Sequence, residues 1–340
     1  MNPGSSDTAA TPLHPDLSRL TKLIDNARAI IVTSHQDADG DSVGAQLAML
    51  QFLRQRGKVA VAMQSGKTPS NLTFLPAAAE ILDIDNGAVA PPPGVDLLIA
   101  LECPNPSRMG VVWKFVSPGV IVVNIDHHAD NTGYGDFVWV DPIASSVAEL
   151  VWRYFGAIDY AIPRDVATCL YAAILTDTGR FRYSGVSDET FRAAGDLVAR
   201  GVEPQTVCDN IYFRRSPAAL KLMGYALSHM SFLAGGRACV IAIPYQAIQS
   251  LNAEKGDTEG VVETTLQSAT ADIGALIREE TEGVVKVSLR SRGPWDVAKV
   301  AAEFGGGGHR NAAGLTLTRP FGEALAIITN RITALVENGE

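Results

Sequence analysis

Short, continuous apolar runs alternate with helical patterns through the first half of the chain, and this alternation restricts its fold more than any other feature. The run at 29–33 is followed by helical spacing at 41–56, and Ser146 with Glu149 forms the pattern of a capping box that opens another helix. Strands that are apolar on both faces and separated by helices indicate a parallel sheet covered on both sides. We therefore expect an α/β fold, with further strands at 59–63, 97–101 and 120–125.

The second half of the chain indicates a helical segment followed by a smaller α/β domain. Strands are expected at 238–243, 273–279 and 284–290, helices at 258–268 and 295–304, and a strand and a last helix after the glycine run 305–308. The sequence thus predicts four parts: a disordered tail at 1–15, a first domain at 16–190, a helical connector at 191–230 and a second domain at 231–340.

Composition excludes several classes of protein. The 340 residues carry a formal charge of −9, which argues against a protein that grips long nucleic acid through its phosphates. No secretory signal pattern is present, and no apolar run reaches the roughly 18 residues that a membrane helix needs. The four cysteines are scattered without a CxxC pair, as expected for reduced thiols; they are Cys103, Cys169, Cys208 and Cys239. We therefore expect a cytoplasmic protein.

Acidic and imidazole side chains follow the expected strands or end a helix. Open parallel sheets place their ligands at the carboxyl ends of their strands, so we expect these groups to converge. Gly40 is expected to let the first loop turn sharply. The groups are His35, Asp39 and Asp41 after the first strand, Glu102 after 97–101, Asp126, His127 and His128 at the end of 120–125, and Asp177 at the end of a helical segment.

This set of ligands predicts a metal site. Hard carboxylates with a few imidazoles suit Mn²⁺ or Mg²⁺, and so many ligands call for two ions about 3.5–4 Å apart that activate a bridging water for attack on phosphorus. Each piece also has an ordinary alternative. Asp39 and Asp41 could cap the helix that follows them, and His127 or His128 could be a hydrogen-bonded structural histidine. Their joint occurrence at successive strand or helix ends favours the metal site.

A glycine run in the second half has two interpretations. Residues 305–308 could be a flexible linker, or their backbone N–H groups could bind an anion. Arg290 and Arg292 lie on or just beyond the preceding strand and could add bidentate phosphate contacts, or could be solvated surface arginines.

These motifs, in this order, resemble the DHH–DHHA1 phosphoesterases from about Leu20 to Val336, and most closely their stand-alone branch of oligoribonucleases and 3′-phosphoadenosine-5′-phosphate (pAp) phosphatases. The motifs are His35-x3-Asp39-x-Asp41, Asp126-His127-His128, Thr176-Asp177-Thr178-Gly179-Arg180-Phe181 and Gly306-Gly307-Gly308-His309. The resemblance implies a parallel-sheet DHH domain joined by the connector to a DHHA1 domain, with the active site in the cleft between them.

The resemblance also implies roles for individual residues. Two Mn²⁺ ions are expected, with Mg²⁺ or another divalent ion as the alternative. His35 and Asp39 would bind one ion, Asp41, His127 and Asp177 the other, and Glu102 would bridge them. His128 would assist at the reacting phosphate, Asp126 would orient a ligand, and Arg108 fits the family's arginine. The second domain would bind the nucleotide through Arg290, Ser291, Gly306, Gly307, Gly308, His309 and Arg310.

One position departs from the family pattern. Glu102 stands where the family has Asp, which makes the expected bridging group one methylene longer. The expected activity is hydrolysis of short oligoribonucleotides to mononucleotides and of pAp to AMP. The alternatives are a cyclic dinucleotide phosphodiesterase (c-di-AMP or pApA) and a metal-poor nucleotide-binding protein. We expect a small nucleotide or short oligonucleotide as the partner, no long duplex and no membrane, and leave a homodimer open.

Overall fold

The computed structural model describes residues 16–85 and 90–339, so the tail expected at 1–15 lies outside the described residues. The chain divides into two compact units, Met1–Arg214 and Arg215–Glu340. Helices of the expected connector at 191–230 are shared between these units. The side chains of Leu197 and Val207 belong to the first core and that of Leu222 to the second.

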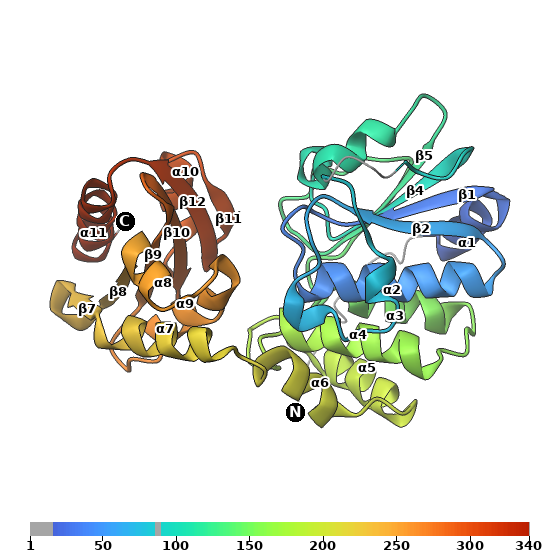
Figure 1. Ribbon diagram of the computed structural model, residues 1–340. Coiled ribbons are helices and arrows are strands. Elements are labelled where there is room, and N and C mark those ends of the chain that lie inside the picture. Colours follow the sequence, from blue (N-terminus) through green and yellow to red (C-terminus); the bar gives the residue numbers. More distant parts are fainter. Residues whose placement is uncertain (1–15, 86–89, 340) are drawn as a thin grey trace, which may run out of the picture. The chain divides into compact units, whose positions relative to one another are not determined.

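The first unit is built on a six-stranded parallel sheet in the order β3-β2-β1-β4-β5-β6 (Figure 1). The parallel sheet expected from the apolar runs is therefore confirmed. The strands are β1 (Ala29–Thr33), β2 (Val59–Gln64), β3 (Leu82–Asp83), β4 (Val95–Leu101), β5 (Ile121–Asp126) and β6 (Phe137–Val140). The helices are α1 (Leu17–Asn26), α2 (Gly40–Gln55), α3 (Val147–Ala157), α4 (Arg164–Asp177), α5 (Asp188–Ala199) and α6 (Pro204–Tyr212), with 3₁₀ helices η1 (Ser70–Leu72), η2 (Ala78–Glu80) and η3 (Pro106–Phe115).

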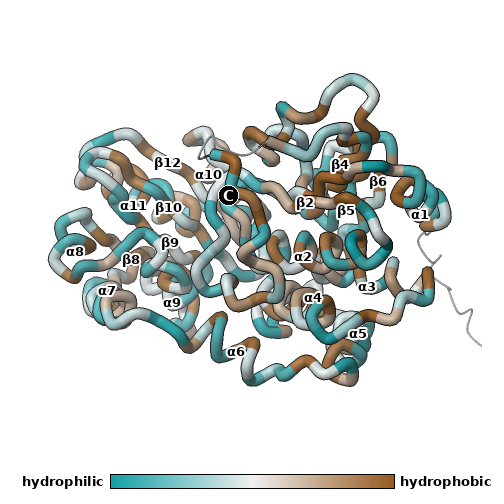
Figure 2. Tube along the Cα trace, turned by 45° about the vertical axis from the view of Figure 1, so that its right-hand side comes forward, coloured by the Kyte–Doolittle hydropathy of each residue, from teal (hydrophilic) through white to brown (hydrophobic). Residues whose placement is uncertain are grey.

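The two faces of this sheet are covered differently. Ile30 and Ile99 point into the larger core with α1 to α5, whereas Ile31 and Leu98 pack against η3. Both faces are thus apolar, as the hydrophobic colour along β4 in Figure 2 illustrates. Helix α2 is almost wholly buried because it packs between the sheet and α3 and α4 (Figure 1).

Two glycines let α2 and α4 approach closely. A Cβ atom on Gly40 would lie 2.1 Å from Oγ1 of Thr176, and one on Gly44 would lie 2.4 Å from the carbonyl oxygen of Cys169. Gly40 is the first residue of α2, so the expectation that it turns the preceding loop sharply is wrong. Its role is to bring the start of α2 against the end of α4, where Asp177 lies.

The expected capping box at the start of α3 is half formed. The hydroxyl of Ser146 accepts a hydrogen bond from the backbone N–H of Glu149. The Glu149 carboxylate does not return to residue 146, because it is completely buried and accepts hydrogen bonds from Ser145, Thr190 and Arg153 instead. This network joins α3 to α5.

The second unit contains a mixed six-stranded sheet in the order β11-β12-β10-β9-β8-β7, in which only the β8–β9 pair is parallel among the described pairings. Helices α10 and α11 cover one face and α7, α8 and α9 the other. The strands are β7 (Met230–Leu233), β8 (Ala238–Ile243), β9 (Ile273–Thr281), β10 (Val284–Ser291), β11 (Gly307–His309) and β12 (Ala312–Thr318). The helices are α7 (Pro217–Ser228), α8 (Tyr245–Ser250), α9 (Val261–Thr265), α10 (Val297–Glu303) and α11 (Phe321–Asn338), with 3₁₀ helices η4 (Ala234–Gly236) and η5 (Lys255–Thr258).

One expectation for this unit is wrong. The single helix expected at 258–268 is broken into η5 and α9 because Gly260 adopts a φ of 75° between them. Of the two interpretations of the glycine run, a flexible linker does not fit residues 307–309, which form an edge strand paired with β12. Among the described helices, none is both long and apolar enough to cross a membrane.

Candidate metal centre

The acids and histidines of the motifs lie where the strand order of the first sheet reverses. β1 has β2 on one side and β4 on the other, so the loops that follow β1 and β4 leave the same edge of the sheet as neighbours. The side chains come from the loop after β1 (His35, Asp39), the first turn of α2 (Asp41), the residue after β4 (Glu102), the two residues after β5 (His127, His128) and the end of α4 (Asp177).

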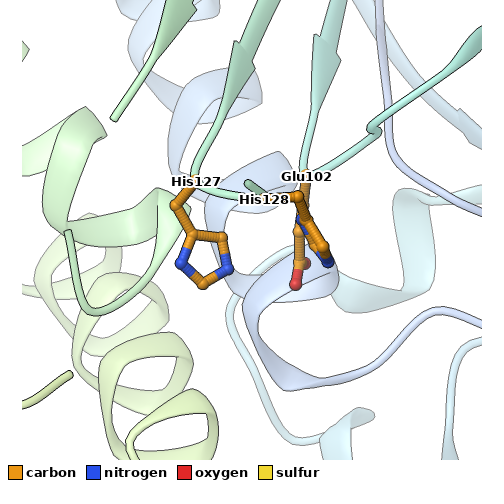
Figure 3. A group of neighbouring side chains, drawn as sticks. All are labelled: Glu102, His127 and His128. Carbon is orange, nitrogen blue, oxygen red and sulfur yellow. The ribbon is translucent and has the colours of Figure 1, made fainter. Parts of the chain in front are cut away.

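Their ligand atoms form three overlapping groups, within each of which all atoms lie within 4.8 Å of one another. Two groups share Glu102 and two share His127, so the three make one continuous cluster. Figure 3 shows Glu102 beside His128, with His127 near both. The groups are His35, Asp39 and Glu102; Asp41, His127 and Asp177; and Glu102, His127 and His128.

The first two groups have the composition that the family resemblance implies for two ion sites. In the first, Nε2 of His35 lies 3.9 Å from Oε2 of Glu102 and 4.0 Å from Oδ2 of Asp39. In the second, Nε2 of His127 lies 3.4 Å from Oδ2 of Asp177. The assignment of each residue to a particular ion stays a prediction.

The hydrogen bonds of His35 and His127 assign the same tautomer to both rings. Nδ1 of His35 lies 2.7 Å from the carbonyl oxygen of Gln36, and Nδ1 of His127 lies 3.1 Å from that of Ala144. A carbonyl oxygen can only accept, so Nδ1 carries the proton and Nε2 keeps its lone pair. Such oxygen partners are those that orient metal-binding histidines in proteins.

The electrostatics of the cluster favour a bound cation. Burial, together with the charges of Asp39 and Asp41, raises the pKa of Glu102 well above its ordinary value. Burial also raises the pKa of Asp41 to about 6, and burial and neighbouring acids raise that of Asp177. Acids held this close cannot all be ionised without added positive charge, which a divalent cation would supply. The donor set therefore fits hard divalent ions.

The capping alternative is realised for Asp39 but not for Asp41, which binds the start of a different helix. Asp39 is the N-cap of α2 and accepts the backbone N–H of Ser42. The Asp41 carboxylate accepts the N–H groups of Val147 and Ala148 at the start of α3, at 2.6 and 2.9 Å. Because an ionised carboxylate has about four lone-pair sites, these bonds orient both groups and leave acceptor capacity for a cation.

Asp126 holds His128 in place. Oδ1 of Asp126 lies 2.8 Å from Nδ1 of His128, and Oδ2 accepts a hydrogen bond from Asn131 at 2.6 Å. Asp126 is completely buried; burial alone would raise its pKa, but the hydrogen bond from His128 and the charge of that ring lower it. Asp126 thus stays ionised and turns Nε2 of His128 toward the cluster.

We expect His128→Ala to lower kcat for phosphate ester hydrolysis by about 10²-fold to 10⁴-fold, the range of general acid catalysis, while both metal ions remain bound. Asp126→Asn should give a smaller loss, because the ring stays but its orientation weakens. Metal content and kcat measured on both purified variants check this. Loss of an ion together with the rate in His128→Ala would instead make His128 a ligand, as its place in the third group allows.

Arg108 stands apart from these groups. It lies in η3 with an exposed side chain, and its carbonyl oxygen accepts a 2.7 Å hydrogen bond from the backbone N–H of Gln36. This bond ties η3 to the loop that carries His35. The structure thus brings the main chain of Arg108 to the site, and its catalytic role stays a prediction.

The expected substrate-binding residues lie where β10, β11 and β12 of the second unit come together. Arg290 pairs with Ala312 across β10 and β12, and His309 pairs with Ala312 from β11, so three adjacent strands meet there. The buried hydroxyl of Ser291 donates to the carbonyl oxygen of Trp295, and the guanidinium of Arg310 donates to that of Pro294.

The glycines are required by close packing between β11 and β12. A Cβ atom on Gly306 would lie 2.2 Å from the carbonyl oxygen of Gly314, and one on Gly308 would lie 2.6 Å from that of Ala312. Gly307 has open space around it. The run therefore keeps the edge strand against its neighbour, and its contact with a nucleotide stays a prediction.

Two residues of these sites were missed from the sequence. Ser42 lies among His35, Asp39 and Glu102, within 3.0 Å of an atom of each. Glu263 of α9 accepts a hydrogen bond from Nε of Arg290 at 3.2 Å and forms an ion pair with its Nη2 at 3.1 Å. Ser42 follows Asp41 directly in the first motif, which was a usable signal, whereas nothing in the sequence links positions 263 and 290.

Comparison with protein families identifies two kinds of domain in the chain. Residues 29–174 match the model of the DHH family, N-terminal domain, and residues 238–338 match that of the DHHA1 domain. The chain is 34% identical over 288 residues to the bifunctional oligoribonuclease and PAP phosphatase NrnA of Thermus thermophilus, which covers 85% of this chain and 84% of that protein. A cyclic-di-AMP phosphodiesterase, GdpP of Geobacillus thermodenitrificans, is 26% identical and covers 94% of this chain but 50% of its own length.

A solved structure has the same fold over almost the whole chain. The crystal structure of an exopolyphosphatase-related protein from Bacteroides fragilis superposes with a TM-score of 0.87 at 28% identity, covering 94% of this chain and 97% of that one. The DHH match spans the positions from His35 to His128, and the DHHA1 match spans the glycine run. The chain belongs to the DHH family and carries a DHHA1 domain after the DHH domain.

Proposed function

We propose that this phosphoesterase hydrolyses short oligoribonucleotides to mononucleotides and dephosphorylates pAp to AMP at the cluster beyond β1, β4 and β5. The observation that carries the proposal is the set of three overlapping ligand groups at the point where the strand order reverses. The similarity to the Thermus oligoribonuclease and PAP phosphatase, which extends over both domains, supports the substrate class.

The seven side chains of the three ligand groups would hold two divalent cations or, in the case of His128, act beside them. A cation pair, with Mn²⁺ as our first choice, would activate a water for in-line attack and neutralise charge on the phosphate. Glu102 belongs to two of the groups and is proposed as the bridging carboxylate. The remaining proposed ligands are His35, Asp39, Asp41, His127 and Asp177.

His128 is proposed to handle the proton of the reaction. Its Nδ1 is held by the ionised Asp126 carboxylate, which stabilises the charged ring. Nε2 can therefore take up a proton and deliver it to the leaving oxygen of the phosphate ester. Exposed Arg108 is proposed as a further contact to the phosphate, through charge-assisted hydrogen bonds.

The second domain is proposed to bind the nucleotide through Arg290, Ser291, Gly306, Gly307, Gly308, His309 and Arg310. Nε of Arg290 donates to Glu263 and Nη1 donates to the carbonyl oxygen of Leu289, and Nη2 forms an ion pair with Glu263. These contacts fix the plane of the guanidinium and leave N–H donors for a phosphate.

We expect Arg290→Ala to lower kcat/KM for the preferred nucleotide by about 10-fold to 100-fold, since a charge-assisted hydrogen bond contributes roughly 1.5–3 kcal/mol. Metal binding should be unchanged. Arg319→Ala is the matched control, because Arg319 is exposed just beyond the opposite end of the same sheet, after β12. An unchanged kcat/KM in Arg290→Ala would remove this residue from the nucleotide site.

A substrate panel with Mn²⁺ tests the proposed function. The panel contains pAp, di- to pentaribonucleotides, cyclic di-AMP and a long single strand. We expect turnover of pAp and of the short oligoribonucleotides, and little of the long strand, because the net charge of −9 offers no basic channel for it. Hydrolysis of cyclic di-AMP alone would favour the second candidate, to which the GdpP relative points.

A further inference from the structure

Ser42 places a single hydroxyl among three groups of the candidate metal centre. Its side chain is completely buried in the first turn of α2. Oγ lies 2.8 Å from Oε2 of Glu102, 2.9 Å from Nε2 of His35 and 3.0 Å from Oδ1 of Asp39. No other described residue contacts all three of these side chains through hydrogen bonds of its side chain.

With a cation bound and both carboxylates ionised, all three neighbours of this hydroxyl would act as acceptors. The carboxylates of Asp39 and Glu102 accept when ionised, and Nε2 of His35 accepts because Nδ1 is bonded to the carbonyl oxygen of Gln36. A hydroxyl has one proton, so it can satisfy only one of them. The shortest distance is to Glu102, and a cation held by His35 and Asp39 would satisfy the other two.

Glu102 has an unusual main-chain conformation. It follows β4 directly, its N–H donates to the carbonyl oxygen of Ile125, and its φ is 54°. This left-handed region is unfavourable for a residue with a long side chain, and Asp tolerates it better. A Glu carboxylate also has one more rotatable bond to fix than an Asp carboxylate.

We propose that Ser42 is a positioning residue that donates its proton to Oε2 of Glu102 and so sets this longer carboxylate in its bridging place. The inference rests on the proposed function of the cluster. It makes positions 42 and 102 a coupled pair, in which the serine hydroxyl fixes the longer Glu carboxylate. The N-cap of α2 does not depend on this hydroxyl, because the Asp39 carboxylate accepts the backbone N–H of residue 42.

A double-mutant cycle on full-length protein tests the coupling, with Mn²⁺ affinity as the readout. The variants are Ser42→Ala, Glu102→Asp and the two combined, and Mn²⁺ binding is followed by calorimetry and by loss of the free-ion EPR signal. Ser34→Ala is the matched control, since Ser34 is equally buried beside His35 and, among the described residues, its hydroxyl has no hydrogen-bond partner. The cycle separates a pairwise effect from two independent ones.

We expect Ser42→Ala to weaken Mn²⁺ binding about 10-fold or more in the wild-type background, the factor that a hydrogen bond to a charged group represents. In the Glu102→Asp background the same change should weaken it less than about threefold, because the shorter carboxylate no longer reaches residue 42. Ser34→Ala should bind Mn²⁺ as the wild type does.

Equal weakening in both backgrounds, or none in either, would overturn the pairing of Ser42 with Glu102. A wild-type protein that binds no Mn²⁺ or Mg²⁺ at all would instead remove the proposed function. The two failures are therefore distinguishable in one experiment. Recovery of kcat in the combined variant relative to Ser42→Ala would be the expected second sign of the pair.

Discussion

Replacing Asp177 by Asn should abolish hydrolysis of pAp and of short oligoribonucleotides, by about 10³-fold or more in kcat/KM, because the chemistry depends on cation charge. Asp177 ends α4, so its negative charge lies at the negative end of that helix dipole. Asp177 also lies close to Asp41 and to His127. Burial and the charges of Asp41 and Asp39 raise the pKa of Asp177. An acid placed so unfavourably is best explained by a cation that it helps to bind.

The same substitution separates loss of function from loss of folding. In a chelating buffer Asp177→Asn should raise the melting temperature, since it removes like-charge repulsion from the metal-free cluster. With Mn²⁺ present the wild type should gain more stability than the variant, because ions that bind only the folded state stabilise it. Asp165→Asn is the control, on the exposed first turn of the same helix. Wild-type rate and metal content in Asp177→Asn would show that another acid completes the site.

Glu102→Gln should remove most of the activity, by about 10²-fold or more, because a neutral amide bridges two cations poorly. Glu102 is 2% exposed, belongs to two ligand groups and has a pKa raised by burial and by three neighbouring acids. Its φ of 54° adds main-chain strain of the kind that collects at functional sites. These features together explain why we expect substitution of Glu102 to have a large effect on activity.

Glu102→Asp is the informative companion variant. It shortens the carboxylate by one methylene, suits the left-handed conformation better and should keep activity within about tenfold of wild type, in either direction, since reactive geometry tolerates about 0.5 Å of misplacement. Metal stoichiometry and kcat measured on Glu102→Gln and Glu102→Asp test whether position 102 provides the bridging carboxylate. Two bound ions and wild-type rate in Glu102→Gln would exclude position 102 as the bridge.

The strands that carry the site could be predicted because their cause is local. β1 is an unbroken apolar run, and its bounds agree with the expectation at 29–33. The acids after β1, β4 and β5 could be expected to meet because parallel strands end at the same edge. Two of the three ligand groups contain the residues that the family resemblance implied for two ions, and the role of each residue stays a prediction.

What could not be predicted depends on contacts between distant segments. Gly40 looked like a turn residue because its neighbour Thr176, on α4, is invisible in the local sequence. Glu149 looked like half of a capping box, yet tertiary hydrogen bonds from Thr190 and Arg153 take up its carboxylate. Residues 307–309 of the glycine run form a strand because β12 lies beside them, and no local sequence pattern indicates that pairing.

The central claim is that divalent cations at this cluster carry the hydrolysis, and the most direct test is a Mn²⁺ titration of protein stripped with EDTA. Bound ions and the rate of pAp and dinucleotide hydrolysis would be measured on the same samples. The account predicts no turnover without metal, and recovery of the full rate as two Mn²⁺ per chain are bound. Full turnover by the stripped protein in EDTA would contradict it.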